Sequence, residues 1–357
     1  MNSRKKKILF IVSNLKVGGG AEKSVSLLAK GLSEHYDVSI LTFYDFKEEY
    51  SITVKRYSFG YNYDASSISK FWRFIVVFPL LLRKFLLRRK YDLVISNAED
   101  ANVVSLVCRK FFFSFRLWTV IRNDIMDRGN VYYRFRGLQR WADKNIVLTN
   151  EFRSKFGSGV VIPNALDVNE VISLKNEDVK EKELFSKKTI LAVGRLSSQK
   201  NYEFLLEVFK GLEDEFNLLI IGDGPLREDL KKKAPKGVYF LGLKKNVYAY
   251  MSKCDVFVLP SLYEGMPRVL MEALSCGCRC VVNDFQTGAR DLLEVPLSHK
   301  VRGFHKSEFG YLVEFNNKKA FKEAIVEISN TKRILPDTRF SLETITKRWA
   351  REIERRS

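Results

Sequence analysis

The sequence has 357 residues and a formal net charge of +19, from 61 Lys and Arg against 42 Asp and Glu. This length corresponds to about two domains of roughly 150 residues each. Hydrophobic residues make up 46% and charged residues 29%, a globular composition that excludes a disordered, collagen-like or disulfide-stapled chain. The surplus of positive charge predicts an anionic partner, which could be nucleic acid, an anionic lipid surface or a phosphorylated substrate.

The first half of the chain alternates short apolar runs with amphipathic stretches. After the basic residues Arg4–Lys7, the apolar run Ile8–Val12 is too short for the core of a signal peptide, and it predicts a buried strand over Ile8–Ser13. Ala21–Ser33 has the pattern of a helix. Further strands are predicted at Val38–Thr42, Leu93–Ser96, Leu117–Ile121, Ile146–Thr149 and Val160–Ile162.

Phe71–Leu87 is the most hydrophobic stretch. Basic residues interrupt it, and its longest apolar part, Phe74–Leu82, is too short to span a membrane. Basic residues beside aromatic and aliphatic ones fit a segment lying on an anionic membrane, and they fit equally a buried helix with a basic edge. The stretch lies in residues 65–144, where 16 basic and 6 acidic side chains give a net charge of +10.

The second half repeats the alternation. Pro163 and Asn164, followed by the polar stretch Asn169–Lys188, are predicted to form a linker. Strands are predicted at Ile190–Val193, Leu218–Ile221, Val238–Leu241, Val256–Leu259, Cys280–Val282 and Tyr311–Val313, and helices at Tyr202–Leu212, Leu226–Lys233, Arg268–Leu274 and Lys318–Ser329. The five cysteines, three of them clustered at residues 276–280, do not fit a disulfide framework or a zinc knuckle and predict buried thiols in a reducing cytoplasm.

Strands that alternate with helices are typical of parallel sheets covered on both faces. Two such series predict an α/β protein with two facing Rossmann-like, doubly wound domains. Ligands of open α/β sheets bind beyond the carboxyl ends of the strands. We therefore expect the site in the cleft between the domains, on loops that follow strands.

Two of these loops carry residues suited to a phosphorylated ligand. Gly18–Gly20 precedes a predicted helix, where glycines let the backbone approach a phosphate. Arg195 and Lys200 flank the turn after Val193, where a guanidinium and an ammonium suit a diphosphate. A flexible turn and a solvated charged turn are the structural alternatives.

Two further loops follow strands in the second half. Glu264 precedes a predicted helix that contains Glu272. Since bare carboxylates would repel a diphosphate, these two glutamates are expected to accept hydrogen bonds from sugar and ribose hydroxyls. Thr287 and Gly288 precede another helix and provide an anion-binding N-terminus.

The third of these loops carries a family resemblance. Its sequence PSLYEGMP, followed by EALSCG, resembles the signature of retaining nucleotide-sugar glycosyltransferases of family four. GGGAEKSVSLLAKGL, VIPNALD, VGRLSSQKN and RFSLETITKRWAREIERR resemble further family segments in the same order, with Ala165 where a glycine is commoner. The resemblance implies the GT-B fold, with an acceptor-binding domain over residues 1–165, a nucleotide-sugar domain over 166–337 and a helix over 338–357 that returns to the first domain.

The resemblance also implies residue roles. Arg195 and Lys200 bind the donor diphosphate and form the catalytic set with Glu264, which contacts sugar hydroxyls, while Glu272 contacts the ribose. Arg122 and Asn123 stand where many family members have a histidine, and they are expected on the acceptor or sugar side. The remaining donor-binding residues implied are Gly19, Gly20, Gly194, Leu243, Gly265, Met266, Thr287 and Gly288.

The chain contains no Asp-x-Asp, which argues against a metal-anchored diphosphate, so we expect neither a metal nor a cofactor beside the nucleotide-sugar substrate. The resemblance implies transfer with retention from a donor, by default a UDP-sugar, to a lipid-linked glycan in capsule, O-antigen or related polysaccharide synthesis, at the cytoplasmic face of an anionic membrane. A nucleotide-sugar epimerase or hydrolase of the same fold is the alternative. A nucleic-acid-binding protein would require a recognition motif, and the sequence contains none.

Overall fold

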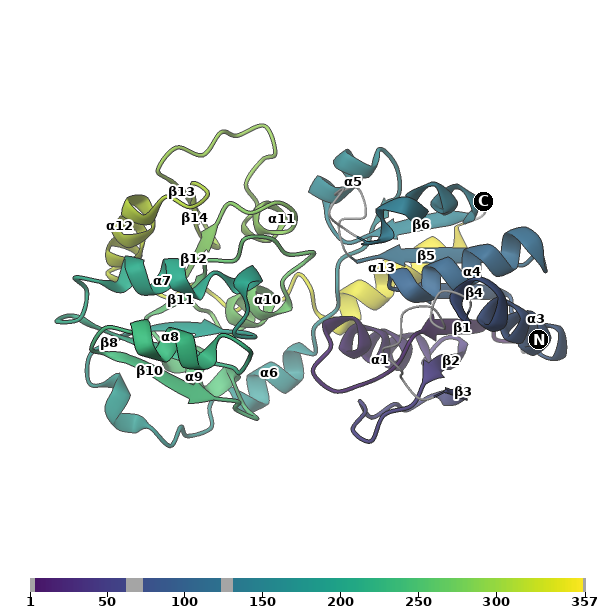
Figure 1. Cartoon of the computed structure of the whole chain (residues 1–357), viewed down its shortest axis with the longest axis horizontal. Coiled ribbons are helices and arrows are strands. Elements are labelled where there is room, and N and C mark those ends of the chain that lie inside the picture. Colours follow the sequence, from purple (N-terminus) through teal and green to yellow (C-terminus); the bar gives the residue numbers. More distant parts are fainter. Residues whose placement is uncertain (1–3, 62–72, 123–130, 356–357) are drawn as a thin grey trace. The chain divides into compact units, whose positions relative to one another are not determined.

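The computed structural model describes residues 4–61, 73–122 and 131–355 and divides the chain into two compact units (Figure 1). The first unit comprises Met1–Ala165 and Ser341–Ser357, and the second comprises Leu166–Phe340. Each unit contains a seven-stranded sheet. Described strand pairs are parallel except β13 with β14, which confirms the prediction of two parallel-rich α/β sheets.

The sheet of the first unit has the order β3-β2-β1-β4-β5-β6-β7. Its strands are β1 (Lys7–Val12), β2 (Asp37–Tyr44), β3 (Lys55–Tyr61), β4 (Leu93–Asn97), β5 (Leu117–Ile121), β6 (Lys144–Val147) and β7 (Val160–Val161). The sequence reasoning missed β3, because this strand lies at the sheet edge with no buried residue and carries no apolar run. The order reverses between β1 and β4, where ligand sites of open sheets form.

Helices cover both faces of this sheet. They are α1 (Gly20–Leu32), η1 (Arg73–Val77), α3 (Phe78–Arg88), α4 (Glu99–Phe111), η2 (Val131–Trp141), α5 (Asn150–Phe156) and α13 (Leu342–Glu354). The start of Phe71–Leu87 lies outside the described residues. In its described part Phe74, Phe78, Leu82 and Leu86 are buried in the core of the unit. The apolar side of this helix therefore packs on the protein.

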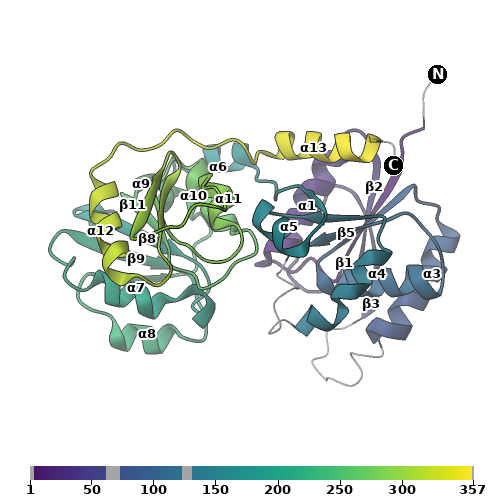
Figure 2. The same cartoon turned by 90° about the horizontal axis from the view of Figure 1, so that it is seen from above.

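The last helix, α13, belongs to the first unit although it follows the second in the sequence. Figure 2 shows it as the yellow helix near α1, and α1 and α13 are in contact. The buried indole of Trp349 lies 6.3 Å from that of Trp118 on β5, and Glu352 pairs with Lys144 at the start of β6. Apolar and ionic contacts thus fix this helix on its unit.

The second sheet has the order β10-β9-β8-β11-β12-β14-β13. Its strands are β8 (Lys188–Val193), β9 (Phe216–Ile221), β10 (Val238–Gly242), β11 (Val256–Leu259), β12 (Cys280–Asn283), β13 (Phe304–Ser307) and β14 (Gly310–Val313). The antiparallel edge strand β13 was not predicted, because its four residues, FHKS, contain one apolar side chain. Here the strand order reverses between β8 and β11.

Helical structure in the second unit begins at α6, before the first helix that was predicted there. They are α6 (Val168–Leu174), η3 (Lys182–Phe185), η4 (Ser198–Lys200), α7 (Tyr202–Phe209), α8 (Arg227–Lys233), α9 (Tyr248–Lys253), α10 (Arg268–Ser275), α11 (Ala289–Leu293) and α12 (Lys318–Ser329). The prediction of a linker over Asn169–Lys188 was wrong. Val171 and Leu184 are buried, and α6 packs on α9 and α10, so this stretch is part of the second unit.

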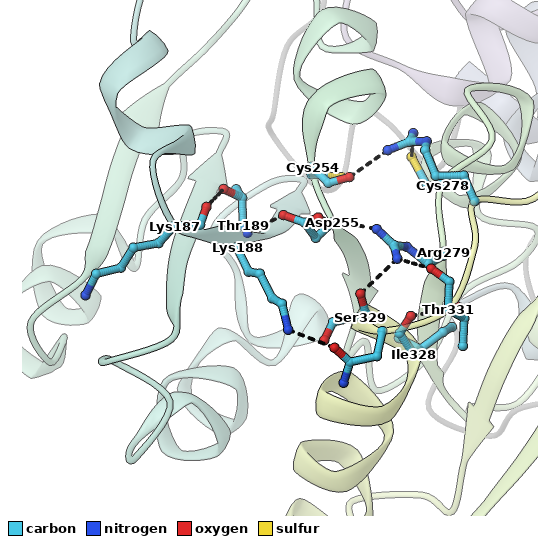
Figure 3. A network of polar contacts seen from close by, with 12 residues as sticks. Lys187, Lys188, Thr189, Cys254, Asp255, Cys278, Arg279, Ile328, Ser329 and Thr331 are labelled. Carbon is cyan, nitrogen blue, oxygen red and sulfur yellow. Dashed lines mark hydrogen bonds and ion pairs between the residues drawn. The ribbon is translucent and has the colours of Figure 1, made fainter.

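Buried polar contacts join the segment after α12 to the amino edge of the second sheet (Figure 3). Asp255 accepts a hydrogen bond from the backbone N–H of Thr189 at 2.8 Å and pairs with Arg279 at 3.3 Å. Arg279 donates to the backbone carbonyls of Ser329 and Thr331. All five cysteines are free and buried, as the sequence predicted. Among the helices described, none combines the length and the apolar character needed to cross a bilayer.

Candidate functional site

Three of the predicted loops meet at the carboxyl edge of the second sheet. The carboxylate of Glu264, after β11, lies 2.5 Å from the ammonium of Lys200, after β8, and both side chains are largely buried, with 11% and 16% exposed. Ser261 donates to the same carboxylate oxygen at 2.8 Å. The structure therefore brings together two of the three predicted catalytic side chains in a partly desolvated ion pair.

The loop after β12 has a strained backbone and is hydrogen-bonded to the loop that carries Glu264. The hydroxyl of Thr287 donates to the carbonyl oxygen of Glu264. Thr287 is buried and has a φ of +68°, which is unusual for a residue with a branched side chain. Gly288 follows with a φ of +94°, and a Cβ there would lie 2.9 Å from the carbonyl oxygen of Gly265. Such strain persists where the surrounding structure enforces it, as at ligand sites.

Another loop at this edge was missed by the sequence reasoning. Residues 222–224, with the sequence GDG, follow β9 and lie against the Arg195 loop. The N–H of Leu196 donates to the carbonyl of Asp223 at 2.9 Å, and the N–H of Leu226 donates to the carbonyl of Leu196 at 3.1 Å. Two glycines directly after a buried strand were the signal that could have revealed this loop.

The other predicted donor residues lie on the same unit with different surroundings. The side chain of Arg195 is exposed and makes no hydrogen bond or ion pair within the described parts of the chain, although its backbone carbonyl accepts a hydrogen bond from Ser197. Leu243, after β10, is 79% exposed, and Met266 is buried. Glu272 lies 3.9 Å from Arg268 on α10, and burial together with this carboxylate raises the pKa of Tyr248.

In the first unit, Gly18–Gly20 form the predicted turn into α1, with Gly19 as the N-cap. A Cβ at Gly19 would lie 1.9 Å from Oε2 of Glu22. The glycine thus leaves room for a carboxylate that folds back over the start of the helix. Burial raises the pKa of Glu22, against the opposing effects of its own backbone N–H and of Arg122.

Arg122, directly after β5, is held by two amide side chains. Its Nε donates to Oδ1 of Asn97 at 2.5 Å and its Nη1 to Oδ1 of Asn164 at 2.7 Å. Its backbone N–H donates to Glu99 at 3.2 Å. Asn97 ends β4 and is followed by Ala98, whose φ of +73° marks a strained turn. Asn123 lies outside the described residues.

Asn97 also carries an unpaired donor. Its Nδ2 is buried and has no hydrogen-bond partner among the described residues, and the same holds for the buried hydroxyls of Ser13 and Ser96. Ser96 is in register with Ile11 on the neighbouring strand β1, so these groups lie where the strand order reverses. Unpaired buried polar groups are costly. The sequence reasoning had named Arg122, but it had not named Asn97 and had placed Asn164 only in the linker.

Comparison with known proteins gave consistent results. The sequence profile of the family described as "Glycosyl transferases group 1" matches residues 187–331. A relative from Campylobacter jejuni, the "GalNAc-alpha-(1->4)-GalNAc-alpha-(1->3)-diNAcBac-PP-undecaprenol alpha-1,4-N-acetyl-D-galactosaminyltransferase", is 28% identical over 309 residues, covering 81% of this chain and 82% of the relative. The "UDP-Gal:alpha-D-GlcNAc-diphosphoundecaprenol alpha-1,3-galactosyltransferase" of Escherichia coli is 34% identical over 188 residues, 48% of this chain and 45% of the relative.

A solved structure shows that the whole chain shares a known fold. Anabaena Alr3699/HepE, crystallised in complex with UDP and glucose, is 18% identical. It superposes with a TM-score of 0.74 over 98% of this chain and 100% of the other.

Proposed function

We propose that this chain, which has the GT-B fold and whose residues 187–331 match the profile of the group 1 glycosyl transferases, belongs to that family and transfers a sugar with retention from a UDP-sugar to a lipid-linked glycan. The setting we propose is the synthesis of a cell-surface polysaccharide such as capsule or O-antigen. Two relatives support the acceptor class, because their names specify undecaprenol-linked substrates. The UDP complex of Alr3699/HepE and the UDP-Gal in the name of the Escherichia coli relative support the donor.

The observation that carries the proposal is the arrangement around Glu264. Its carboxylate lies beside Lys200, while its backbone carbonyl is bonded to the loop of Thr287 and Gly288. A carboxylate that can accept hydrogen bonds from sugar hydroxyls, an ammonium group and a strained backbone turn are thereby held together at one edge of the sheet. A nucleotide sugar offers hydroxyls and a diphosphate a few bonds apart, which matches this set of groups.

In the proposed mechanism, Arg195 and Lys200 stabilise the leaving nucleoside diphosphate. The bond from C1 of the sugar to the diphosphate oxygen breaks, and the acceptor hydroxyl bonds to C1 from the same face. The hydroxyl proton passes to a diphosphate oxygen, so no protein base is needed. Lys200 is paired with Glu264, whereas Arg195 is exposed and has no such partner in the described chain. Arg195 is therefore the cation most available to the leaving group.

Kinetics of an Arg195→Ala variant test this role. If Arg195 stabilises charge that develops as the diphosphate leaves, kcat should fall by about 100-fold or more. A raised KM for the donor with a nearly normal kcat would contradict the assignment, because Arg195 would then only bind the donor. Lys187→Ala, at the amino edge of the same unit, is a matched control, since its ammonium contacts a loop carbonyl.

We assign Arg122 to the sugar side. The carboxylate of Glu22 partly compensates its charge, so its surroundings favour donation to neutral sugar oxygens over the capture of a phosphate. We also propose that the transfer needs no metal, because cationic side chains and helix N-termini would stabilise the diphosphate. Activity should then persist in EDTA, and a requirement for Mg²⁺ or Mn²⁺ would refute this part.

An epimerase or hydrolase of the same fold is distinguished by its products. A panel of UDP- and GDP-sugars, each incubated with and without a lipid-linked glycan, should give a glycosylated lipid with one donor. Release of free sugar or of an epimerised nucleotide sugar, unchanged by the acceptor, would instead support the alternative. Since the proposed acceptor is held in a membrane, we also propose that the protein acts peripherally on the anionic, cytoplasmic face of that membrane.

A further inference from the structure

The structure separates two sides of α3 that the sequence could not separate. Phe74, Phe78, Leu82 and Leu86 recur every fourth residue and are buried in the core. The same helix leaves Leu80 43% exposed and Leu87 50% exposed. These two leucines are seven residues apart and so lie on one side of the helix. The apolar residues still available for contact are therefore on the outer side of α3.

The end of α4 extends this outer surface. Helices α3 and α4 pack together (Figure 1), and Arg83 on α3 donates to the carbonyl of Phe112 just after α4 at 3.2 Å. Phe111, the last residue of α4, is 65% exposed and lies edge-on to Trp141 at 5.7 Å. We call this surface, formed by the outer side of α3, the end of α4 and Trp141, the α3–α4 face.

The cations of the α3–α4 face are not balanced by carboxylates. In the described part of the chain, none of six basic side chains forms an ion pair, namely Arg83, Lys84, Arg88, Lys110, Arg116 and Arg140. Lys110 and Arg140 instead lie over the ring of Trp141, at 5.3 and 5.6 Å. Asp143 is held by Arg109, which keeps the pKa of this carboxyl low although its burial acts in the opposite direction.

A cavity of about 470 Å³ opens beside this face, at the amino ends of β5 and β6. It is lined by Arg109, Ser114, Phe115, Arg116, Trp118, Asp143 and Lys144. Lys144 and Arg109 are paired with Glu352 and Asp143. Arg116 lies 5.6 Å from the ring of Trp118 and forms no direct ion pair in the described chain, although its charge helps to lower the pKa of Asp143 and of Glu354. It is therefore the cation with which an anionic group could pair here.

Helix C-termini favour basic residues, which accounts for Arg88 and Lys110 but not for the exposed Phe111, Leu80 and Leu87 beside them. Exposed apolar side chains among unpaired cations match the interface of an anionic bilayer, where apolar groups enter the acyl boundary and cations meet phosphates. We propose that the α3–α4 face docks on an anionic phospholipid bilayer and that the cavity at Arg116 takes a headgroup phosphate. This inference rests on the proposed membrane acceptor, and it assigns the docking surface to the amino edge of the first sheet, opposite the carboxyl end of β5 where Arg122 lies.

Vesicle binding tests the inference. The protein should bind vesicles that contain phosphatidylglycerol more tightly than vesicles of phosphatidylcholine. Each cation near an anionic surface contributes a similar amount to the free energy of binding. Removing two cations with Lys84→Gln and Arg88→Gln should therefore weaken vesicle binding by about 30-fold, and removing one with Arg116→Gln should weaken it by about 5-fold. Phe111→Ser should weaken it further through the apolar contact. The matched control is Lys232→Gln with Lys236→Gln, two exposed lysines of the second unit.

An equal loss in the control pair would overturn the inference, because net charge alone would then explain binding. Equal affinity for phosphatidylcholine, or RNA binding that is as tight and equally sensitive to the same variants, would overturn it as well. Thermal unfolding of each variant confirms that it is folded. Transfer to a water-soluble acceptor should be unchanged in the α3–α4 variants. Vesicle binding without any transfer would contradict the proposed function and leave the docking surface standing.

Discussion

The positioning of Arg122 by Asn97 can be measured as a coupling energy. The hydrogen bond from Nε of Arg122 to Oδ1 of Asn97 is 2.5 Å long, and a bond to a charged group contributes about 1.5–3 kcal/mol. If Asn97 acts by orienting Arg122 toward the sugar, Asn97→Ala should lower kcat/KM by about 12- to 150-fold. The stability cost should be smaller, because the substitution also removes the buried Nδ2 that has no partner.

The assay is a double-mutant cycle with Arg122→Met, which separates positioning from simple support of the fold. When Arg122 is already replaced, Asn97→Ala should cost little more, so that the coupling energy is close to its full single effect. Asn102→Ala is the matched control. This buried asparagine of α4 donates to the carbonyl of Val120 at 2.9 Å without a contact to Arg122, and its effect should add to that of Arg122→Met. Additive losses for Asn97 and Arg122 would refute the reasoning.

Further expectations concern the second unit and the α13 contact. Glu264→Gln leaves Lys200 without its anionic partner, so the free energy of unfolding should fall by about 1–3 kcal/mol in urea titrations and transfer should be nearly lost; wild-type stability would contradict this. Gly288→Ala should weaken donor binding in calorimetry and destabilise the protein by about 1–3 kcal/mol, more than Gly60→Ala, whose Cβ would meet nothing within 4 Å. Trp349→Ala should cost about 3–5 kcal/mol in the unfolding of the first unit, because its indole is 97% buried. Burial, His299 and Arg290 lower the pKa of His305; since the unfolded chain then binds the proton more readily, stability should fall as the pH drops below about 6.5, and His305→Gln should flatten this slope.

The sequence predicts the strands that are buried runs and the loops that follow them. It misses β3 and β13 because an edge strand needs no continuous apolar run, and it assigns α6 to a linker because half of a short helix is polar. Glu264 and Lys200 could be named from the motif and their order. Their pairing required the fold, because the two residues come from strands β11 and β8, which are adjacent in space but far apart in sequence.

Asn97, Asn164 and the GDG loop illustrate a different limit. Asparagines and glycines are common in loops, and nothing in their spacing shows that they converge on one arginine or one turn. Phe71–Leu87 shows the same limit for surfaces, since one helix carries a buried apolar side and an outer side with separate leucines. The amino-acid composition of this stretch does not show which of its apolar residues are buried and which are exposed. The packing of the helix in the fold decides this for each residue.

The place of α13 in the chain has a consequence for synthesis. A ribosome synthesises the whole second unit before it adds Ser341–Ser357, so the first sheet lacks α13 while the 175 intervening residues are added. Until then the indole of Trp118 and the ammonium of Lys144 lack the partners that α13 brings. A released chain truncated after Phe340 should therefore contain a protease-resistant second unit and a sensitive first one. The synthesis of α13, more than the order of the two units, would set when the first unit matures.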